Sequence, residues 1–416
     1  MFHKILKTAI RDGSLSVIDP QGRRHDFGGG GFPANLPGQA PQPSIIRLHD
    51  PAFFRRFIIS PELAMGEAYM DGTLTVEEGT LYDALGTIIH NLNRYSRHNR
   101  FFQFHWFLNR ALRWVHQHNP VGRAARNVAH HYNLSDDLYR LFLDRDRQYS
   151  CAYWADDTQT LEQAQEAKKR HIAAKLCLTP DLRVLDLGCG WGGLALYLAR
   201  EHDVRVTGVT LSREQHAVAQ RRARETGLDD RVDFRLQDYR HVTDRFDRIV
   251  SVGMFEHVGV NHYDEYFHKT CDLLSEDGVF LLHTIGRAER PGGTNTWLRK
   301  YIFPGGYTPA LSEVVEHVEH TDWIITDVEI LRVHYAETLR HWRERFMAQR
   351  DHVVGDLYDE RFFRMWEFYL AGCEVVFRFD RQVVFQIQLT RTLGATPLTR
   401  TYIHRPETER SAMAAE

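Results

Sequence analysis

Three short segments carry residue types that could do chemistry, and their spacing suits one pocket. In the first, over residues 184–193, an apolar run breaks into alternating glycines. The second, over residues 149–154, contains Cys151, and the third, over residues 251–259, contains Glu256 followed by a histidine. A strand that ends in alternating glycines lets backbone N–H groups close on a cofactor that carries adenosine. The three segments therefore predict a cofactor site with ionisable side chains beside it.

The glycine turn predicts S-adenosylmethionine as that cofactor. A dinucleotide enzyme usually has an acidic residue about 20 residues further on to hold the ribose, but the second strand here ends at Thr210-Leu211 without one. No Lys-Ser or Lys-Thr pair follows the glycines, which excludes a nucleotide P-loop. Asp186-x-Gly188-x-Gly190 is a familiar opening of an S-adenosylmethionine site, and Asp238 ends the third strand where it can meet the adenine edge. The alternative is a glycine turn that serves only close packing.

Composition bounds the class of protein. A chain of 416 residues suits two domains, and its net charge of -3 gives no global attraction to nucleic acid or anionic lipid. Five cysteines without a C-x-x-C pair argue against a disulfide framework and against a zinc site, so we expect no metal and a reducing cytoplasm. Nowhere do 18 apolar residues run together, and the N-terminus lacks a long apolar stretch. We therefore expect a protein that neither spans a membrane nor is exported.

Repeated βα units from about residue 182 predict an α/β fold with a doubly wound, mainly parallel sheet. Helices are expected after Gly192 and from Ser212, where Ser212 and Gln215 have the spacing of a capping box. Residues 383–389 alternate between apolar and polar and are expected to form an edge or hairpin strand. The other expected strands are 183–187, 204–210, 232–236, 248–252 and 279–284.

Residues 1–90 are predicted to form a smaller α+β domain with no obvious catalytic group. A strand pair is expected around residues 15–18, and helical spacing of apolar residues predicts helices over 52–59 and 81–89. The consecutive glycines at 28–31 are expected to lie in a loop. This domain is predicted to associate with lipid.

A basic aromatic helical linker is predicted over residues 91–130. From Ala84 to Ser135 the chain has no Asp or Glu, while arginines interleave with aromatic residues. Such a helix can pack on a core with its basic face in water, dock on anionic phospholipid, or stack with single-stranded nucleic acid. The catalytic domain is expected to follow over residues 131–404, and residues 405–416 to form a disordered tail.

With these segments described, the chain resembles the cyclopropane fatty acid synthases, which are S-adenosylmethionine-dependent methyltransferases that act on unsaturated acyl chains. The resemblance covers most of the chain. It rests on His131-Tyr132-Asn133-Leu134, Tyr149-Ser150-Cys151-Ala152-Tyr153-Trp154, residues 185–193, Thr210-Leu211-Ser212-x-x-Gln215, Asp238-Tyr239-Arg240, residues 253–259 and His283-Thr284-Ile285-Gly286. It implies a seven-stranded sheet of the class I methyltransferase type, with a smaller N-terminal domain.

The motifs and the resemblance together predict the residues that contact the cofactor. The predicted contacts are Tyr149, Ser150, Asp186, Gly188, Cys189, Gly190, Trp191, Gly192, Thr210, Leu211, Gln215, Asp238, Tyr239 and Gly253.

The chemistry of the resembling family assigns roles to further polar residues. An alkene attacks the sulfonium methyl group and leaves a carbocation, which must then lose a proton to close the ring, so a base is required. The resemblance implies a bound bicarbonate ion as this base. Its expected holders are Cys151, Glu256, His283, the backbone of Ile285, and Tyr335. Cys373 matches a cysteine suggested as a nucleophile, although methyl transfer to an alkene requires no thiolate.

Each of these residues also has a structural alternative. Cys151 can be a small buried hydrophobic residue, Glu256 and His257 a polar pair at the start of a helix, and His283 a histidine satisfied within a core. The aromatic helix around residues 362–370 can be core, a wall for an acyl tail, or both.

The predicted function is the conversion of a cis double bond in a phospholipid acyl chain to a cyclopropane. The expected partner is unsaturated phospholipid in the cytoplasmic leaflet, reached by a cytoplasmic protein that binds the membrane peripherally, with no nucleic acid partner. The resemblance also allows a homodimer. One alternative is the same methyl transfer ending in a methyl-branched or methylated unsaturated chain. Another is a lipid-binding protein without catalysis, against which the presence of Glu256, His283 and Cys151 argues.

Overall fold

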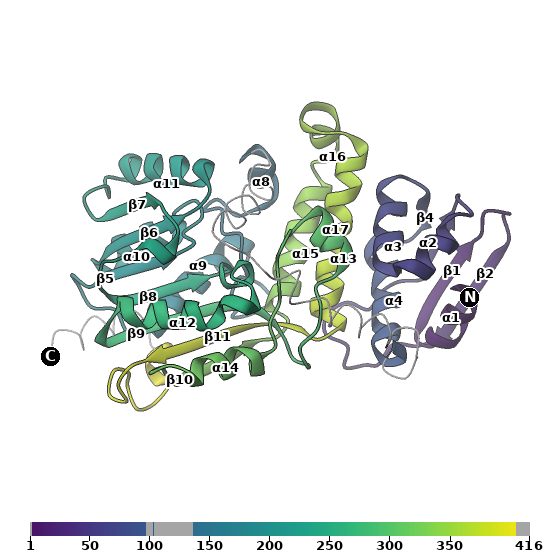
Figure 1. Ribbon diagram of the computed structural model, residues 1–416. Helices are drawn as coiled ribbons and strands as arrows, with labels where there is room; N and C mark the ends of the chain where they lie inside the picture. The colour runs from purple at the N-terminus through teal and green to yellow at the C-terminus, as the bar shows by residue number, and fades with distance from the viewer. Residues whose placement is uncertain (1, 97–102, 104–135, 405–416) are drawn as a thin grey trace. The chain divides into compact units, whose positions relative to one another are not determined.

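The computed structural model describes residues 2–96, 103 and 136–404, and these residues form two compact units (Figure 1). The predicted basic aromatic linker, the motif at 131–134 and the predicted tail lie almost wholly or wholly outside the described residues. Described residues up to 103, with 292–304 and 335–382, make the first unit, and the remainder make the second.

A four-stranded sheet with the strand order β2-β1-β3-β4 organises the first unit. The predicted strand pair is confirmed, because β1 and β2 are antiparallel neighbours. The prediction of a loop at the consecutive glycines is wrong, since β2 continues through Gly28 to Gly30. Gly28 has a φ of 87°, and a Cβ there would lie 2.2 Å from the carbonyl oxygen of Gly13, so the bulged pairing needs glycine. The strands are β1 (Gly13–Ile18), β2 (Arg24–Gly30), β3 (Ser44–Leu48) and β4 (Leu74–Glu78).

Helices complete the core of the first unit. The long helix α17 packs against α3 and α4, and its buried residues Ala371, Val375 and Phe379 join a core that includes Leu15 and Phe53. This packing places a late segment of the chain in the first unit, so the structural units do not follow the continuous domains expected from the sequence. The helices are α1 (Phe2–Ala9), α2 (Phe53–Ile59), α3 (Pro61–Met70), α4 (Leu81–Ser96), α13 (Thr296–Tyr301), α15 (His334–Met347), α16 (Arg350–His352), the π-helix η4 (Val353–Leu357) and α17 (Glu360–Phe379).

The second unit contains the predicted seven-stranded, mainly parallel sheet, with the order β10-β11-β9-β8-β5-β6-β7. Five neighbouring strands, from β9 to β7, pair in parallel, while β10 and β11 pair antiparallel. The last strand is expected at an edge or in a hairpin; the edge position is wrong, because β11 lies between β9 and β10, but β11 does pair antiparallel with β10, the preceding strand. The strands are β5 (Arg183–Leu187), β6 (Arg205–Thr210), β7 (Val232–Leu236), β8 (Phe246–Val252), β9 (Leu274–Arg287), β10 (Ile324–Leu331) and β11 (Gln382–Thr390).

Alternate residues of these strands bury against helices on opposite faces of the sheet, which confirms the doubly wound arrangement (Figure 1). Val250 and Leu281 pack with α9, α10 and α11, whereas Ile249, Phe280 and Leu282 pack with α12 and α14. The helices are α8 (Asp136–Phe142), α9 (Leu161–Lys175), α10 (Gly193–His202), α11 (Arg213–Thr226), α12 (Tyr263–Leu273), α14 (Leu311–Glu319) and α18 (Thr401–His404), with short 3₁₀ turns η1 (Tyr239–His241), η2 (Phe255–His257) and η3 (Val260–His262). Among the described helices none is long and apolar enough to cross a membrane.

Candidate active site

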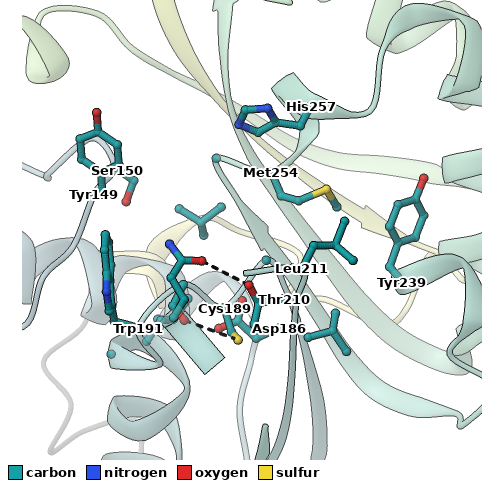
Figure 2. Close-up of a pocket in the computed structure, with 18 of the residues that line it drawn as sticks. Tyr149, Ser150, Asp186, Cys189, Trp191, Thr210, Leu211, Tyr239, Met254 and His257 are labelled. Carbon is teal, nitrogen blue, oxygen red and sulfur yellow. Dashed lines mark hydrogen bonds between the residues drawn. The ribbon is translucent and has the colours of Figure 1, made fainter. Parts of the chain in front are cut away.

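A pocket lies at the carboxyl ends of the central parallel strands of the second unit (Figure 2). Parallel strands end at one edge of the sheet, so the loops that follow β5, β6, β7 and β8 gather there. Of the fourteen predicted cofactor contacts, all except Gly192 line this pocket. The pocket therefore brings together residues separated by about a hundred positions in the chain.

The loop after β5 owes its shape to glycine. Gly188, Gly190 and Gly192 have φ values of 83°, 54° and 81°, in the left-handed region that glycine adopts without strain. A Cβ on Gly188 would lie 2.8 Å from the Cβ of Met254, which leaves no room for a side chain. A Cβ on Gly190 would meet no atom within 4 Å. Gly190 therefore leaves its backbone accessible from the pocket, as a closely approaching ligand requires.

Asp186, on β5, lies under the glycine loop and is only 2% exposed. Its Oδ2 has no hydrogen-bond partner among the described residues. Burial raises the pKa of Asp186 to about 7, and the charge of Lys168 partly opposes this rise. A buried carboxylate oxygen without a partner at the wall of a pocket fits a ligand that brings a hydrogen-bond donor or a positive charge.

Thr210 and Gln215 connect the end of β6 to helix α11. The hydroxyl of Thr210 donates to the side-chain oxygen of Gln215 over 3.2 Å and accepts from the backbone N–H of Ser212. Ser212 caps the helix by accepting from the backbone N–H of Gln215, as predicted. The prediction of a full capping box is wrong, because the Gln215 side chain bonds to Thr210 rather than to the backbone of Ser212. Gln215 is thereby held at the pocket.

Asp238 follows β7 and is already engaged by Arg240. The two form a bidentate pair, with nitrogen to oxygen distances of 2.9 and 2.7 Å. Burial acts to raise the pKa of Asp238, but the hydrogen bonds from Arg240 outweigh it and hold the pKa below its usual value. Asp238 is therefore an ionised acceptor whose position is fixed by its neighbour. Tyr239 lies beside it, on the side of the pocket opposite Tyr149 and Ser150 (Figure 2).

A second polar group lies at the ends of β8 and β9. The backbone N–H of Gly253, at the pocket wall, donates to the carbonyl oxygen of His283 over 3.0 Å. Glu256 accepts from the backbone N–H of Ile285 over 2.6 Å, and its Oε2 has no hydrogen-bond partner in the described part of the chain. Burial raises the pKa of Glu256 to about 7. The Ile285 N–H that the resemblance assigns to a bicarbonate ion is thus bonded to Glu256 in this structure.

His283 is a buried, uncharged imidazole. Burial lowers its pKa to about 3, and the charges of Lys168 and Lys175 act in the same direction. Its Nδ1 accepts from the side-chain amide of Gln386, on β11, over 3.1 Å. The neutral ring therefore carries its proton on Nε2, where it can donate to an anion.

The remaining predicted catalytic residues differ in their placement. Cys151 is buried in the second unit, and burial raises the pKa of its thiol, so the group is uncharged. Tyr335 and Cys373 belong to the first unit, where the Tyr335 ring packs 4.8 Å from that of Phe377. Burial raises the pKa of Cys373 to about 12, which argues against a thiolate nucleophile. The catalytic roles assigned to Tyr335 and Cys373 stay predictions.

Sequence reasoning missed several residues that the structure places here. Met254 and His257 line the pocket within a motif that was recognised, and Gln386 was hidden in a strand expected at the edge. Lys168, on α9, is fully buried and donates to Gln148 and Ser150, which line the pocket. No motif marks Lys168, because it lies in a helix rich in charged residues.

Comparison with known proteins agrees with this geometry. The model of the mycolic acid cyclopropane synthetase family matches residues 120–387. The cyclopropane-fatty-acyl-phospholipid synthase of Escherichia coli K12 is 41% identical over 350 residues, which cover 84% of this chain and 88% of the relative. Among solved structures, the cyclopropane synthase MmaA2 from Mycobacterium tuberculosis is 34% identical with a TM-score of 0.62 and covers 65% of this chain and 99% of its own. The mycolic acid cyclopropane synthase CmaA1, solved with SAH and CTAB, is 36% identical with a TM-score of 0.61 and covers 64% of this chain and 97% of its own.

Proposed function

The chain belongs to the cyclopropane synthase family of S-adenosylmethionine-dependent methyltransferases, and on this basis we propose that it converts a cis double bond of an unsaturated phospholipid acyl chain to a cyclopropane. The observation that carries the proposal is that the backbone of His283 and the residue Glu256 both lie directly next to chain segments that line the cofactor pocket. Gly253 lines the pocket and bonds to His283, and Glu256 lies three residues further along the chain and bonds to Ile285.

The reaction requires an electron-rich alkene beside the methyl group of the cofactor. A new carbon–carbon bond forms as the bond between sulfur and the methyl carbon breaks, and the ring closes when the transferred carbon loses a proton. S-adenosylmethionine supplies the methyl group and carries the positive charge that makes it electrophilic. The second unit contributes a pocket whose walls include the buried Asp186, whose unpartnered oxygen favours a positively charged ligand.

The proton must pass to a base, and we propose that bicarbonate acts in this role. The donor set fits such an ion, because the Nε2–H of His283 can donate to it and the Oε2 of Glu256, which has no partner among the described residues, can accept its hydrogen. Glu256, with its pKa raised to about 7, can also hold a proton itself. The Gln386 amide fixes the His283 tautomer that makes this donation available.

The proposal is tested with purified protein, unsaturated phospholipid vesicles and labelled S-adenosylmethionine. We expect a labelled acyl chain that has gained one CH2 and shows the ring protons of a cyclopropane in its proton NMR spectrum. A methyl-branched or methylated alkene in that spectrum would correct the product, and unlabelled lipid would refute the proposal. Glu256→Gln should lower turnover strongly, with Glu319→Gln, on an exposed turn of α14, as the matched control.

The partner is proposed to be phospholipid in the cytoplasmic leaflet, reached by peripheral binding, with a homodimer as the assembly. Support for a lipid partner comes from the named function of the E. coli relative and from the CTAB in the CmaA1 structure. Co-flotation with anionic vesicles at low salt, weakened at high salt, is the expected behaviour. A protein that stays at the bottom of the gradient at every salt concentration would contradict peripheral binding.

A further inference from the structure

Lys168 is a buried cation without a direct counter-ion among the residues that the structure describes. Its side chain is 0% exposed, and its ammonium group donates to two neutral oxygens, the side-chain oxygen of Gln148 over 2.6 Å and the hydroxyl of Ser150 over 2.9 Å. Within the described residues no carboxylate lies within 4.0 Å of it. Its neighbour Lys169 pairs with Asp146, and the equally buried Lys175, on the same helix, lies 2.6 Å from Glu329.

An unpaired buried charge destabilises the folded protein, because its desolvation is not offset by an opposite charge. Its position therefore suits a ligand that carries the opposite charge. Burial lowers the pKa of Lys168 to about 8, with the charges of Asp144 and Asp146 opposing this effect from a distance. The two arginines at the pocket wall are already neutralised, because Arg240 pairs with Asp238 and Arg147 pairs with Asp136. Among the described residues, Lys168 is therefore a cation next to this end of the pocket that has no acidic partner, and it can reach an anion there through the Ser150 hydroxyl.

The hydrogen bond from Lys168 also fixes the direction of the Ser150 hydroxyl. An ammonium group can only donate, so the Ser150 oxygen accepts, and the hydroxyl hydrogen must point elsewhere. Ser150 lines the pocket and makes no other side-chain hydrogen bond within the described residues. Its hydrogen is therefore available to an acceptor in the pocket. Lys168 sets the direction of the donation without entering the pocket wall itself.

We propose that Lys168 is a positioning residue that aims the Ser150 hydroxyl at the carboxylate of S-adenosylmethionine and balances the charge of that carboxylate. If the adenine end of the cofactor lies by Asp238 and Tyr239, its amino-acid end reaches the opposite side, where Ser150 lies (Figure 2). The inference rests on cofactor binding, as proposed above, and it is independent of the lipid product.

The test compares two ligands by isothermal titration calorimetry. S-adenosylhomocysteine carries the carboxylate, whereas 5′-methylthioadenosine has the same nucleoside and sulfur without the amino-acid group. In Lys168→Met we expect S-adenosylhomocysteine to bind about 10- to 100-fold more weakly, since a hydrogen bond to a charged group is lost, while methylthioadenosine binding changes by less than about twofold. Equal weakening of both ligands, or no change in either, would overturn the proposal.

Lys175→Met is the matched control, because it removes an equally buried lysine from the same helix, one that pairs with Asp327 and Glu329 instead of with the pocket residues Gln148 and Ser150. We expect it to lower stability but to keep the ratio of the two affinities. If Lys168→Met does not fold, Ser150→Ala tests the same proposal. It must weaken the binding of S-adenosylhomocysteine while it leaves the binding of methylthioadenosine nearly unchanged. The double variant should lose no more affinity for S-adenosylhomocysteine than whichever single variant binds it more weakly. Additive losses of affinity would refute the link between Lys168 and Ser150.

Failure of this inference can be told apart from failure of the proposed function. Wild-type protein that binds S-adenosylhomocysteine but labels no lipid refutes the function and leaves the role of Lys168 open to the same calorimetric test. Protein that labels lipid, and whose Lys168→Met variant discriminates the two ligands as the wild type does, refutes the role of Lys168 alone.

Discussion

Replacing Glu256 by glutamine is expected to stabilise the folded protein at pH 8 while it lowers turnover. The carboxyl group is buried, and burial raises its pKa to about 7 from the ordinary value of 4.5. Glutamine has nearly the same shape. Its oxygen can still accept from the Ile285 N–H, and its nitrogen takes the place of an oxygen that has no partner in the described structure.

The sign of the pH dependence follows from proton binding. Below about pH 4.5 both the folded and the unfolded chain hold the proton, so the ionisation of Glu256 costs nothing. Between pH 4.5 and 7 the unfolded chain releases the proton that the folded chain keeps, and stability falls as the pH rises. Above pH 7 the cost is constant at about 3 kcal/mol, because each unit of pKa difference corresponds to about 1.4 kcal/mol.

The assay is urea denaturation of wild type and Glu256→Gln at pH 5 and pH 8, followed by the fluorescence of the tryptophans. We expect the advantage of the variant to grow by about 2 kcal/mol between the two pH values, in line with the linkage above. The exposed substitution Glu319→Gln should show no such growth. A variant that is less stable than wild type at pH 8, or whose advantage is the same at both pH values, would refute the account of Glu256 as an acid whose pKa is raised by burial.

Further outcomes follow from other contacts. Gly188→Ala should lose about 1–3 kcal/mol of stability and weaken S-adenosylhomocysteine binding, because its Cβ would lie 2.8 Å from Met254 and its φ is positive; denaturation and calorimetry measure both. Gln386→Leu should slow turnover at unchanged cofactor affinity, since it removes the donor to His283 Nδ1; steady-state kinetics and calorimetry separate the two effects. At pH 7, binding of S-adenosylmethionine should release more protons than binding of S-adenosylhomocysteine, because its sulfonium charge lowers the pKa of Asp186 from about 7; calorimetry in buffers of different ionisation enthalpy checks this.

The sheet and its glycine loop could be predicted because both depend on local sequence. Apolar runs bounded by turn residues marked the parallel strands, and the predicted bounds of β5 and β7 agree with the structure residue for residue. The position of β11 could not be predicted in this way. Its polar residues Gln386 and Gln388 alternate as they would on a solvated face, yet both are buried and bonded to His283 and to the carbonyl oxygen of Lys175. Alternation reports which residues share a face and not what covers that face.

The residues of the candidate site also divide into those that the sequence could identify and those that it could not. Asp186 and Glu256 lie in short motifs close to glycines, so the sequence could name them. Lys168 could not be named, because its proposed role arises from its burial and from its hydrogen bonds to two neutral oxygens, with no carboxylate of the described residues within ion-pair distance, and these are properties of the packed molecule. The bond between Glu256 and Ile285 likewise joins residues 29 positions apart through the pairing of β8 and β9.

The buried ionisable groups around the pocket lower the free energy of unfolding of the free protein, and a ligand of suitable charge can offset this loss. Asp186, Glu256 and Lys168 are all buried, and burial shifts each pKa toward the uncharged form, to about 7, 7 and 8. In the free protein they weaken the fold near neutral pH. On the proposal that the sulfonium lies beside Asp186 and the carboxylate beside Lys168, cofactor binding would favour the ionised form of both groups and turn part of this loss of stability into binding free energy. Such an arrangement would favour a ligand that carries both charges over its neutral nucleoside fragment, so Asp186 and Lys168 would both reduce the stability of the free protein and contribute to the selectivity of the pocket.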